Sequence, residues 1–399
     1  MKTRFSATAI AATAIIAVAL PAGSASSADV PVPALPWLHE GLVLTFTWYA
    51  GVAPGNGTDW QEDPNGNWVD PRTGQHLRGV QQHGTSGSGW KQVTITCIEA
   101  DKAAVTVTNF ADDRAQGNYQ PVPQSVGESA FAPVADPGEY WMDPNKLASL
   151  HTIASQNILV THIPWKAGDH TVNATRVQVI KDGSYDDHIY DPKTGLCLHF
   201  AGSHRGAPPK YVGPGDMGLG DTTLSRGDFI GARDISVPWA REAMPDAVAS
   251  LRELHYRGPI IFHGSLPSPN SVNFEDMNVL NHGRGWVELA STRGSQNQRL
   301  QTPPVRSKQA FGRSQFGGLW VGPHAVASLK QGQVLDEDPI TKIRTYVGKV
   351  DERSVVIVSR NGSGEIDNEY DARTGLRIGN SFYDILSQQQ WTLRLQGRE

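Results

Sequence analysis

The sequence is poor in the features that would assign a catalytic class. It has only two cysteines in 399 residues and no CxxC pair, so a disulfide-rich scaffold and a dithiol redox site are excluded. Its 13 histidines include no H-E-x-x-H or H-x-H pair. The nearest approach to G-x-S-x-G, at residues 84–89, has the wrong spacing. The letters G-x-G-x-x-G at residues 213–218 contain a proline in a loop-like run and open no helix, so they predict a loop.

Charge of one sign is not clustered, and long apolar runs are missing from most of the chain. Lys and Arg total 35 against 40 Asp and Glu, a net charge of −5 that is spread along the sequence. Nucleic-acid binding requires a clustered positive face, so we expect no nucleic-acid partner. No run after residue 28 is long and apolar enough for a spanning helix, so we expect no membrane span after signal cleavage.

The one long apolar run lies at the N-terminus and predicts export. Lys2 and Arg4 precede an apolar stretch at residues 7–20, and small residues then suit a cleavage site after Ala28. We predict a signal peptide over residues 1–28 and a secreted or periplasmic destination. Disulfides persist in such compartments. Cys97 and Cys197 each lie in a strand-like run, and we predict that they form one disulfide, with two separate buried thiols as the alternative.

An internal repeat is the strongest signal that is present. The pattern W-x-x-P-x-x-[LV]-A-S-L begins at Trp141 and again at Trp320, and Y-D-x-x-T-G-L begins at Tyr190 and again at Tyr370. The two motifs are therefore displaced by 179 and 180 residues, and unrelated motifs rarely share an offset. We interpret the chain as two copies of one module.

Within each copy the pattern is that of strands. Alternating β-branched residues lead into tight-turn pairs at Asp182-Gly183 and Asn361-Gly362. High glycine (41) and proline (26) contents agree with many turns. We predict an all-β fold of two tandem, internally duplicated antiparallel modules, each a curved sheet or barrel-like, with few short helices. Helical turns are predicted after Pro144 and Pro323, and a longer helix over Pro245–Leu254.

Unequal spacing between the repeated motifs predicts where the first copy carries extra residues. The predicted organisation is a signal peptide at 1–28, a first module at 31–237 with inserts at about 55–90 and 206–220, a linker at 238–247, and a second module at 248–399. Features present in both copies are expected to serve the fold. Features present in one copy are candidates for function.

The first insert contains Trp60, Trp68 and Trp90 within a polar, glycine-rich stretch. Exposed tryptophans suit stacking on sugar rings or on another flat apolar ligand, so we predict that these three residues bind a ligand. The alternative is that the rings fold back over the open end of the module as a plug.

Two weaker site hypotheses remain open. His188, Asp187 and His199 flank the first-copy hairpin and are candidate catalytic residues of a hydrolase. The oxygens of Asp63, Asn65, Asn67 and Asp70 are spaced like a calcium loop, although two successive turns explain the same letters. We predict no other cofactor or metal.

These observations favour a secreted or periplasmic binding protein for a glycan or an apolar ligand, using the first-module insert. The alternatives are an extracellular polymer hydrolase that uses histidine and aspartate residues of the first module, and a structural cell-envelope protein. The sequence leaves open whether the chain is an enzyme and which protein partner it has.

Overall fold

The computed structural model describes most of the chain beyond its N-terminal segment. The predicted signal peptide at residues 1–28 lies outside the described residues. The described ranges are 35–53, 60–63, 67–76, 87–111, 122–123, 128–134, 139–167, 169–181, 183–205, 222–262, 271–297, 300–301, 304–362, 364–384 and 389–398.

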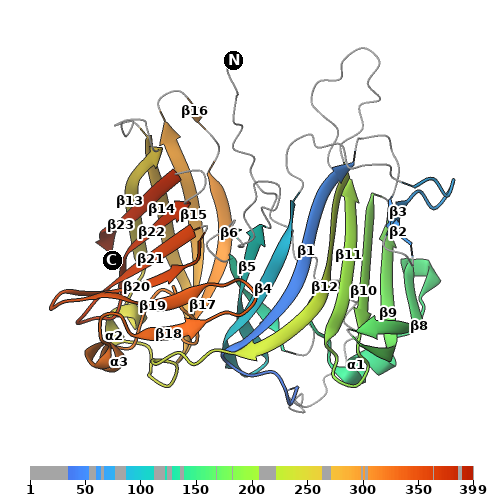
Figure 1. Ribbon diagram of the computed structural model, residues 1–399, viewed down its shortest axis with the longest axis horizontal. Coiled ribbons are helices and arrows are strands. Elements are labelled where there is room, and N and C mark those ends of the chain that lie inside the picture. The colour runs from blue at the N-terminus through green and yellow to red at the C-terminus, as the bar shows by residue number, and fades with distance from the viewer. Residues whose placement is uncertain are drawn as a thin grey trace. The chain divides into compact units, whose positions relative to one another are not determined.

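Two large antiparallel sheets contain most of the described residues, which confirms the predicted all-β class. The first sheet has 10 strands, and a separate hairpin, β2–β3, lies between its first two strands in the chain (Figure 1). In chain order these strands are β1 (Leu42–Ala53), β2 (Gln61–Glu62), β3 (Trp68–Val69), β4 (Gly87–Glu99), β5 (Lys102–Ala111), β6 (Val122–Pro123), β7 (Glu128–Pro133), β8 (Ile158–Ala167), β9 (His170–Lys181), β10 (Ser184–Tyr190), β11 (Cys197–Arg205) and β12 (Thr222–Asp234).

The second sheet has 11 strands and follows in the chain. Its strands are β13 (Glu253–Phe262), β14 (Ser271–His282), β15 (Trp286–Asn297), β16 (Leu300–Gln301), β17 (Val305–Gly312), β18 (Val334–Glu337), β19 (Arg344–Val350), β20 (Ser354–Arg360), β21 (Gly364–Asp371), β22 (Arg377–Asp384) and β23 (Gln389–Arg398).

The two sheets share one strand order. The first runs β6-β5-β4-β1-β12-β11-β10-β9-β8, with β7 beside β5, and the second runs β16-β15-β14-β13-β23-β22-β21-β20-β19-β18, with β17 beside β15. The paths match strand for strand, apart from β18 in the second and the β2–β3 hairpin in the first. Each path has two ends, so the described strands form open, curved sheets and no closed barrel (Figure 1). We call β1–β12 the first module and β13–β23 the second; the boundary positions given above remain predictions.

The described helices are short, and none is long and apolar enough to cross a membrane. Helices α1 and α3 begin at Pro144 and Pro323, as the repeat motif predicts. The helix expected over Pro245–Leu254 is shorter, because β13 begins at Glu253. The helices are α1 (Pro144–Ser149), α2 (Asp246–Ala249) and α3 (Pro323–Ser328), with one 3-10 turn, η2 (Ala154–Gln156).

The repeated motifs make the same contacts in both modules. Trp141 forms an isolated β-bridge with Leu196, and Trp320 forms the equivalent bridge with Leu376. The amide of Met142 donates to the carbonyl of Gly195 at 2.9 Å, and that of Val321 donates to Gly375, also at 2.9 Å. The Trp motif therefore packs on the Thr-Gly turn, and we call this contact the latch. The latch is the structural reason that both sequence patterns recur.

The latch requires glycine in the turn. Gly375 has φ +67, and a Cβ there would lie 2.0 Å from the Val321 carbonyl oxygen. The left-handed conformation and the close contact each oppose a side chain. We expect Gly375→Ala to lower the free energy of unfolding by roughly 2 kcal/mol or more in chemical denaturation. Gly332→Ala is the matched control, since Gly332 also has a positive φ (+81) but nothing within 4 Å of its Cβ position, so it should show the conformational part alone.

By compactness the chain divides into two units. One consists mainly of residues 46–88 and 134–230, and the other of 36–45, 89–133 and 231–399. The larger unit contains apolar clusters built around Trp320 and Trp239, and the smaller contains one built around Trp60 and Trp68. Trp60, Trp68 and the residues that pack around them belong to the smaller unit.

The predicted disulfide is wrong, because Cys97 and Cys197 are both free and buried. They belong to different compact units and pack in separate surroundings. Cys97 packs beside Ala104 and Ala310, whereas the Cys197 thiol donates to the His199 carbonyl at 3.1 Å. Burial, with a smaller contribution from Glu40, raises the pKa of the Cys97 thiol to about 12, so this sulfur is uncharged at neutral pH.

Candidate functional site

The first-module insert packs on the sheet through two of its three tryptophans. Trp60 and Trp68 are 4% and 7% exposed and pack with Tyr185, Ala201 and Leu224 of β10, β11 and β12. The Ser203 hydroxyl donates to the Trp60 carbonyl at 2.6 Å. Both rings are buried against the sheet, so their expected exposure is wrong.

A buried ion cluster fixes the same insert. Glu62 of β2 accepts a hydrogen bond from His199 Nε2 at 2.7 Å, and Asp228 of β12 accepts one from Nδ1 at 2.8 Å. The side chains of His199 and Glu62 are each 6% exposed. Arg226 Nη1 lies 3.4 Å from the second oxygen of Glu62. One imidazole therefore bridges the insert to β12.

The cluster stabilises the charged form of its histidine. Burial alone would lower the pKa of His199, but the hydrogen bonds to Asp228 and Glu62 outweigh it and raise that pKa to about 9. The pKa of Asp228 is lowered: burial would raise it, and the hydrogen bond and charge of His199 prevail. At neutral pH the cluster is an imidazolium between two carboxylates.

This geometry limits what His199 can do chemically. Both ring nitrogens carry protons that are donated to carboxylates, so the ring has no free lone pair to act as a general base or to bind a metal. The register places His199 opposite Ile189 and His188 opposite Phe200, so the two histidines project from opposite faces of the sheet. His188 instead stacks on Tyr190, with ring centroids 6.0 Å apart. His188 and His199 are therefore not brought together, although both were predicted for a hydrolase site.

Asp187 shares a face with His199 but is held by a network of its own. It is 1% exposed, and Arg176 Nε lies 3.0 and 2.9 Å from its two oxygens. The Tyr185 hydroxyl donates to Asp187 Oδ2 at 2.8 Å, and Gln178 donates to that hydroxyl at 3.3 Å. The carboxylate is fully occupied by donors, as buried carboxylates generally are.

Half-buried aromatic rings border the ion cluster. The Trp165 ring lies 5.0 Å from the His199 ring, centroid to centroid. The Arg226 guanidinium lies over the Tyr49 ring at 5.3 Å. The Asp228 side chain is 54% exposed, so one carboxylate of the cluster faces solvent. We define the first-module shelf as these four residues: Tyr49, Trp165, Arg226 and Asp228.

Sequence reasoning found part of this arrangement. It selected Trp60, Trp68 and His199, but Trp90 lies half-buried on β4 and outside the Trp60 cluster. It missed Trp165, which alternation along β8 places among the half-buried positions. It also missed the pairing of Glu62 with His199, because 137 residues separate them and no local spacing marks the contact.

The oxygens predicted for calcium are used within their own turns. Asp63 accepts from the Asn67 amide at 2.8 Å, and Asp70 accepts from the Arg72 amide at 2.9 Å. Asn65 lies outside the described residues. In the part of the chain that is described, no group of three or more His, Cys, Asp or Glu side chains is arranged to hold a metal ion.

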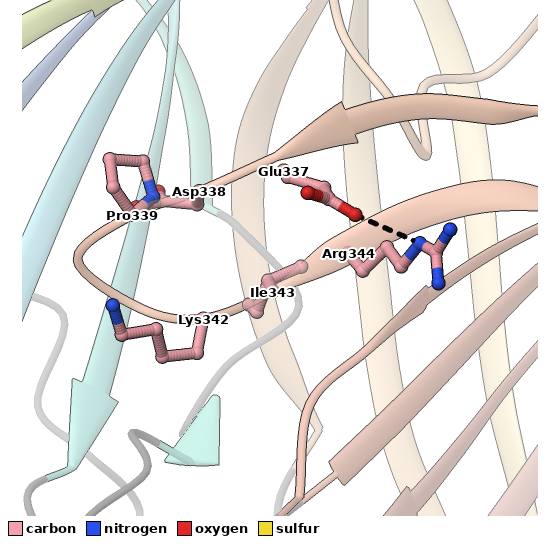
Figure 2. Close-up of a pocket in the computed structure, with 6 residues that line it drawn as sticks. All are labelled: Glu337, Asp338, Pro339, Lys342, Ile343 and Arg344. Carbon is pink, nitrogen blue, oxygen red and sulfur yellow. Dashed lines mark ion pairs between the residues drawn. The ribbon is translucent and has the colours of Figure 1, made fainter.

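A pocket of about 440 Å³ lies at the turn between β18 and β19 of the second module (Figure 2). Its lining comes from this one hairpin, and Glu337 and Arg344 form an ion pair across it at 3.0 Å. The buried carboxylate, Asp338, already accepts from the Ile340 and Thr341 amides at 2.7 and 3.1 Å. The polar groups of this pocket are either bonded to other residues of the hairpin or exposed to solvent. We therefore place the candidate site on the first-module shelf and not in this pocket. The lining residues are Glu337, Asp338, Pro339, Lys342, Ile343 and Arg344.

Comparisons with known proteins add little to this geometry. No protein-family model matches the sequence. No curated protein matches it either. Among solved structures, the chain is similar to a protein of unknown function from the DUF3598 family of Nostoc punctiforme, with 8% identity, over 88% of this chain and 95% of that one. The TM-score is 0.14, which is too low to carry fold or function across.

Proposed function

We propose that this chain is an exported binding protein for a glycan or another flat apolar ligand, and that the first-module shelf is its contact surface. One observation carries the proposal: two half-buried aromatic rings, Trp165 and Tyr49, border a fixed cluster of charges that includes the exposed carboxylate of Asp228. Aromatic faces pack on flat apolar surfaces, and polar groups beside them set orientation.

The insert has a supporting role in this proposal. Trp60 and Trp68 are buried, so they shape the shelf from beneath by holding Glu62 against His199. Export rests on the N-terminal sequence pattern alone, and it agrees with a binding surface that works outside the cell. The imidazolium state of His199 gives no support to the hydrolase alternative at this cluster.

The test is retention of residues 29–399 on chitin, cellulose, xylan and a powdered polyester, with the supernatant assayed for released products. We expect retention on one of these polymers, and a loss of affinity of about two- to tenfold in Trp165→Ala and in Tyr49→Ala. Tyr346→Ala, at another half-buried aromatic position in a strand, is the control and should bind like the wild type. Retention that is unchanged in both shelf variants, or absent for the wild type on every polymer, would refute the proposal.

A further inference from the structure

The second module has a small groove at the place where the first module carries its ion networks. The groove has a volume of about 90 Å³, and its lining includes Val356, Asp367, Glu369, Gly379, Ser381 and Arg394. Liquid water occupies ~30 Å³ per molecule, so the space suits a group of a few heavy atoms and is too small for a sugar ring.

Strand register shows which first-module positions correspond to this groove. In β9–β10, Arg176 pairs with Ile189 and Gln178 with Asp187. In β20–β21, Val356 pairs with Glu369 and Val358 with Asp367. Asp367 is therefore the counterpart of Asp187, and Val356 is the counterpart of Arg176. The two modules retain the aspartate and differ in its partner.

The network around Asp187, in which Arg176 and Tyr185 donate to the carboxylate and Gln178 donates to Tyr185, is replaced in the second module. Arg176 becomes Val356, Gln178 becomes Val358, and the position of Tyr185 is taken by Glu365. A guanidinium, an amide and a phenol are thus exchanged for two apolar side chains and a carboxylate. The aspartate loses its countercharge and gains a like charge nearby.

The remaining contacts leave Asp367 with an unused acceptor. The Ser381 hydroxyl donates to Oδ2 at 3.3 Å, whereas Oδ1 is buried and has no hydrogen-bond partner among the described residues. Burial and the charge of Glu365 raise the pKa of Asp367. The charge of Arg360 opposes this rise only in part, because Arg360 is paired with Glu365; Arg394 is paired with Glu369. Asp367 lines the groove and has no ion pair among the described residues, so a cationic donor bound there would stabilise its carboxylate.

We propose that this groove binds the guanidinium group of a small guanidino compound, with Asp367 as its acceptor. The first module supplies the precedent, since there the equivalent carboxylate holds the Arg176 guanidinium in its fork. Val356 leaves open the position that this guanidinium occupies in the first module. Glu369 and Arg394, paired at the edge of the groove, border the bound group. The proposal is independent of the first-module shelf.

The test is a calorimetric or NMR titration of the mature protein with ethylguanidine, and with ethylurea as the neutral isostere. We expect saturable binding of ethylguanidine and at least tenfold weaker binding of ethylurea, because a charge-assisted hydrogen bond to a carboxylate is stronger than a neutral one. Asp367→Asn should weaken ethylguanidine binding about tenfold or more, whereas Asp101→Asn, an exposed carboxylate elsewhere, should leave it unchanged.

A second variant, Val356→Arg, keeps Asp367 and places an arginine side chain of the protein itself in the groove. Val356→Arg should restore the first-module pair, abolish ethylguanidine binding and raise the melting temperature, and the rise should vanish when Asp367→Asn is added. Equal affinity for ethylurea, unaltered binding by Val356→Arg, or full binding by folded Asp367→Asn would each overturn the proposal.

Discussion

Replacement of Arg176 by methionine is expected to lower the free energy of unfolding by about 3–5 kcal/mol, because breaking a buried ion pair leaves one charge without compensation. Asp187 is 1% exposed, so water does not reach the abandoned carboxylate. The Tyr185 hydroxyl, which donates at 2.8 Å, would remain but carries no charge. Chemical denaturation at pH 7 measures the effect.

The double variant Arg176→Met/Asp187→Leu serves as the control for this prediction. Apolar residues of similar volume replace buried ion pairs at little cost in other proteins, so most of the lost stability should return. A single-variant loss below about 1 kcal/mol would place the pair in solvent and contradict the burial described here. The result also measures how much stability the ion pair contributes in the first module. The second module lacks this pair, because Val356 takes the position equivalent to Arg176.

Replacement of His199 by leucine is expected to detach the β2–β3 insert. Without the imidazolium, Glu62 and Asp228 lose their shared donor, and Glu62 keeps only Arg226 at 3.4 Å. We expect a loss of about 3–5 kcal/mol, as for other buried pairs that lose one partner. Exposure of Trp60 and Trp68 should shift tryptophan emission to longer wavelength and make residues 60–63 and 67–76 sensitive to protease. An unshifted spectrum and an intact insert would contradict the prediction.

His199 also makes the stability of the docked insert depend on pH in the alkaline range. The folded-state pKa of His199 is about 9 against an ordinary value of 6.5, so its stabilising contribution is complete below pH 6.5 and disappears as the pH rises through about 9. The difference corresponds to about 3 kcal/mol at most. Denaturation midpoints measured from pH 6 to pH 10 should fall for the wild type and stay level over this window for His199→Leu, once shared effects are subtracted.

The duplication and the strand character were predictable because they depend on local patterns. Trp141 and Trp320 are followed by the same residue pattern, and the Thr-Gly turns at Gly195 and Gly375 need a left-handed glycine. The residues that form the latch are therefore recognisable from short stretches of sequence. The helix expected over Pro245–Leu254 ended early because the strand that begins at Glu253 pairs with β14 and β23, a tertiary effect that local propensity does not contain.

The site was only partly predictable because its contacts cross long stretches of chain. The insert tryptophans were expected to be exposed on the basis of their polar neighbours, yet Trp60 and Trp68 find cover on β10, β11 and β12. The disulfide was inferred from number and compartment, which contain no information on where Cys97 and Cys197 pack. The Asp367 groove was invisible until strand register aligned it with Asp187.

The pairing of the first and last strands of the first module has a consequence for how the chain acquires its structure. Thr47 and Asp228 are in contact although 181 positions separate them, so the sheet is completed only after β12 has emerged and met β1. Pairings of such long sequence separation slow folding, because loop closure precedes any gain from contacts. If the chain is exported as proposed, slow pairing of β1 with β12 would keep the polypeptide unfolded during translocation. The first-module shelf would then form only after translocation.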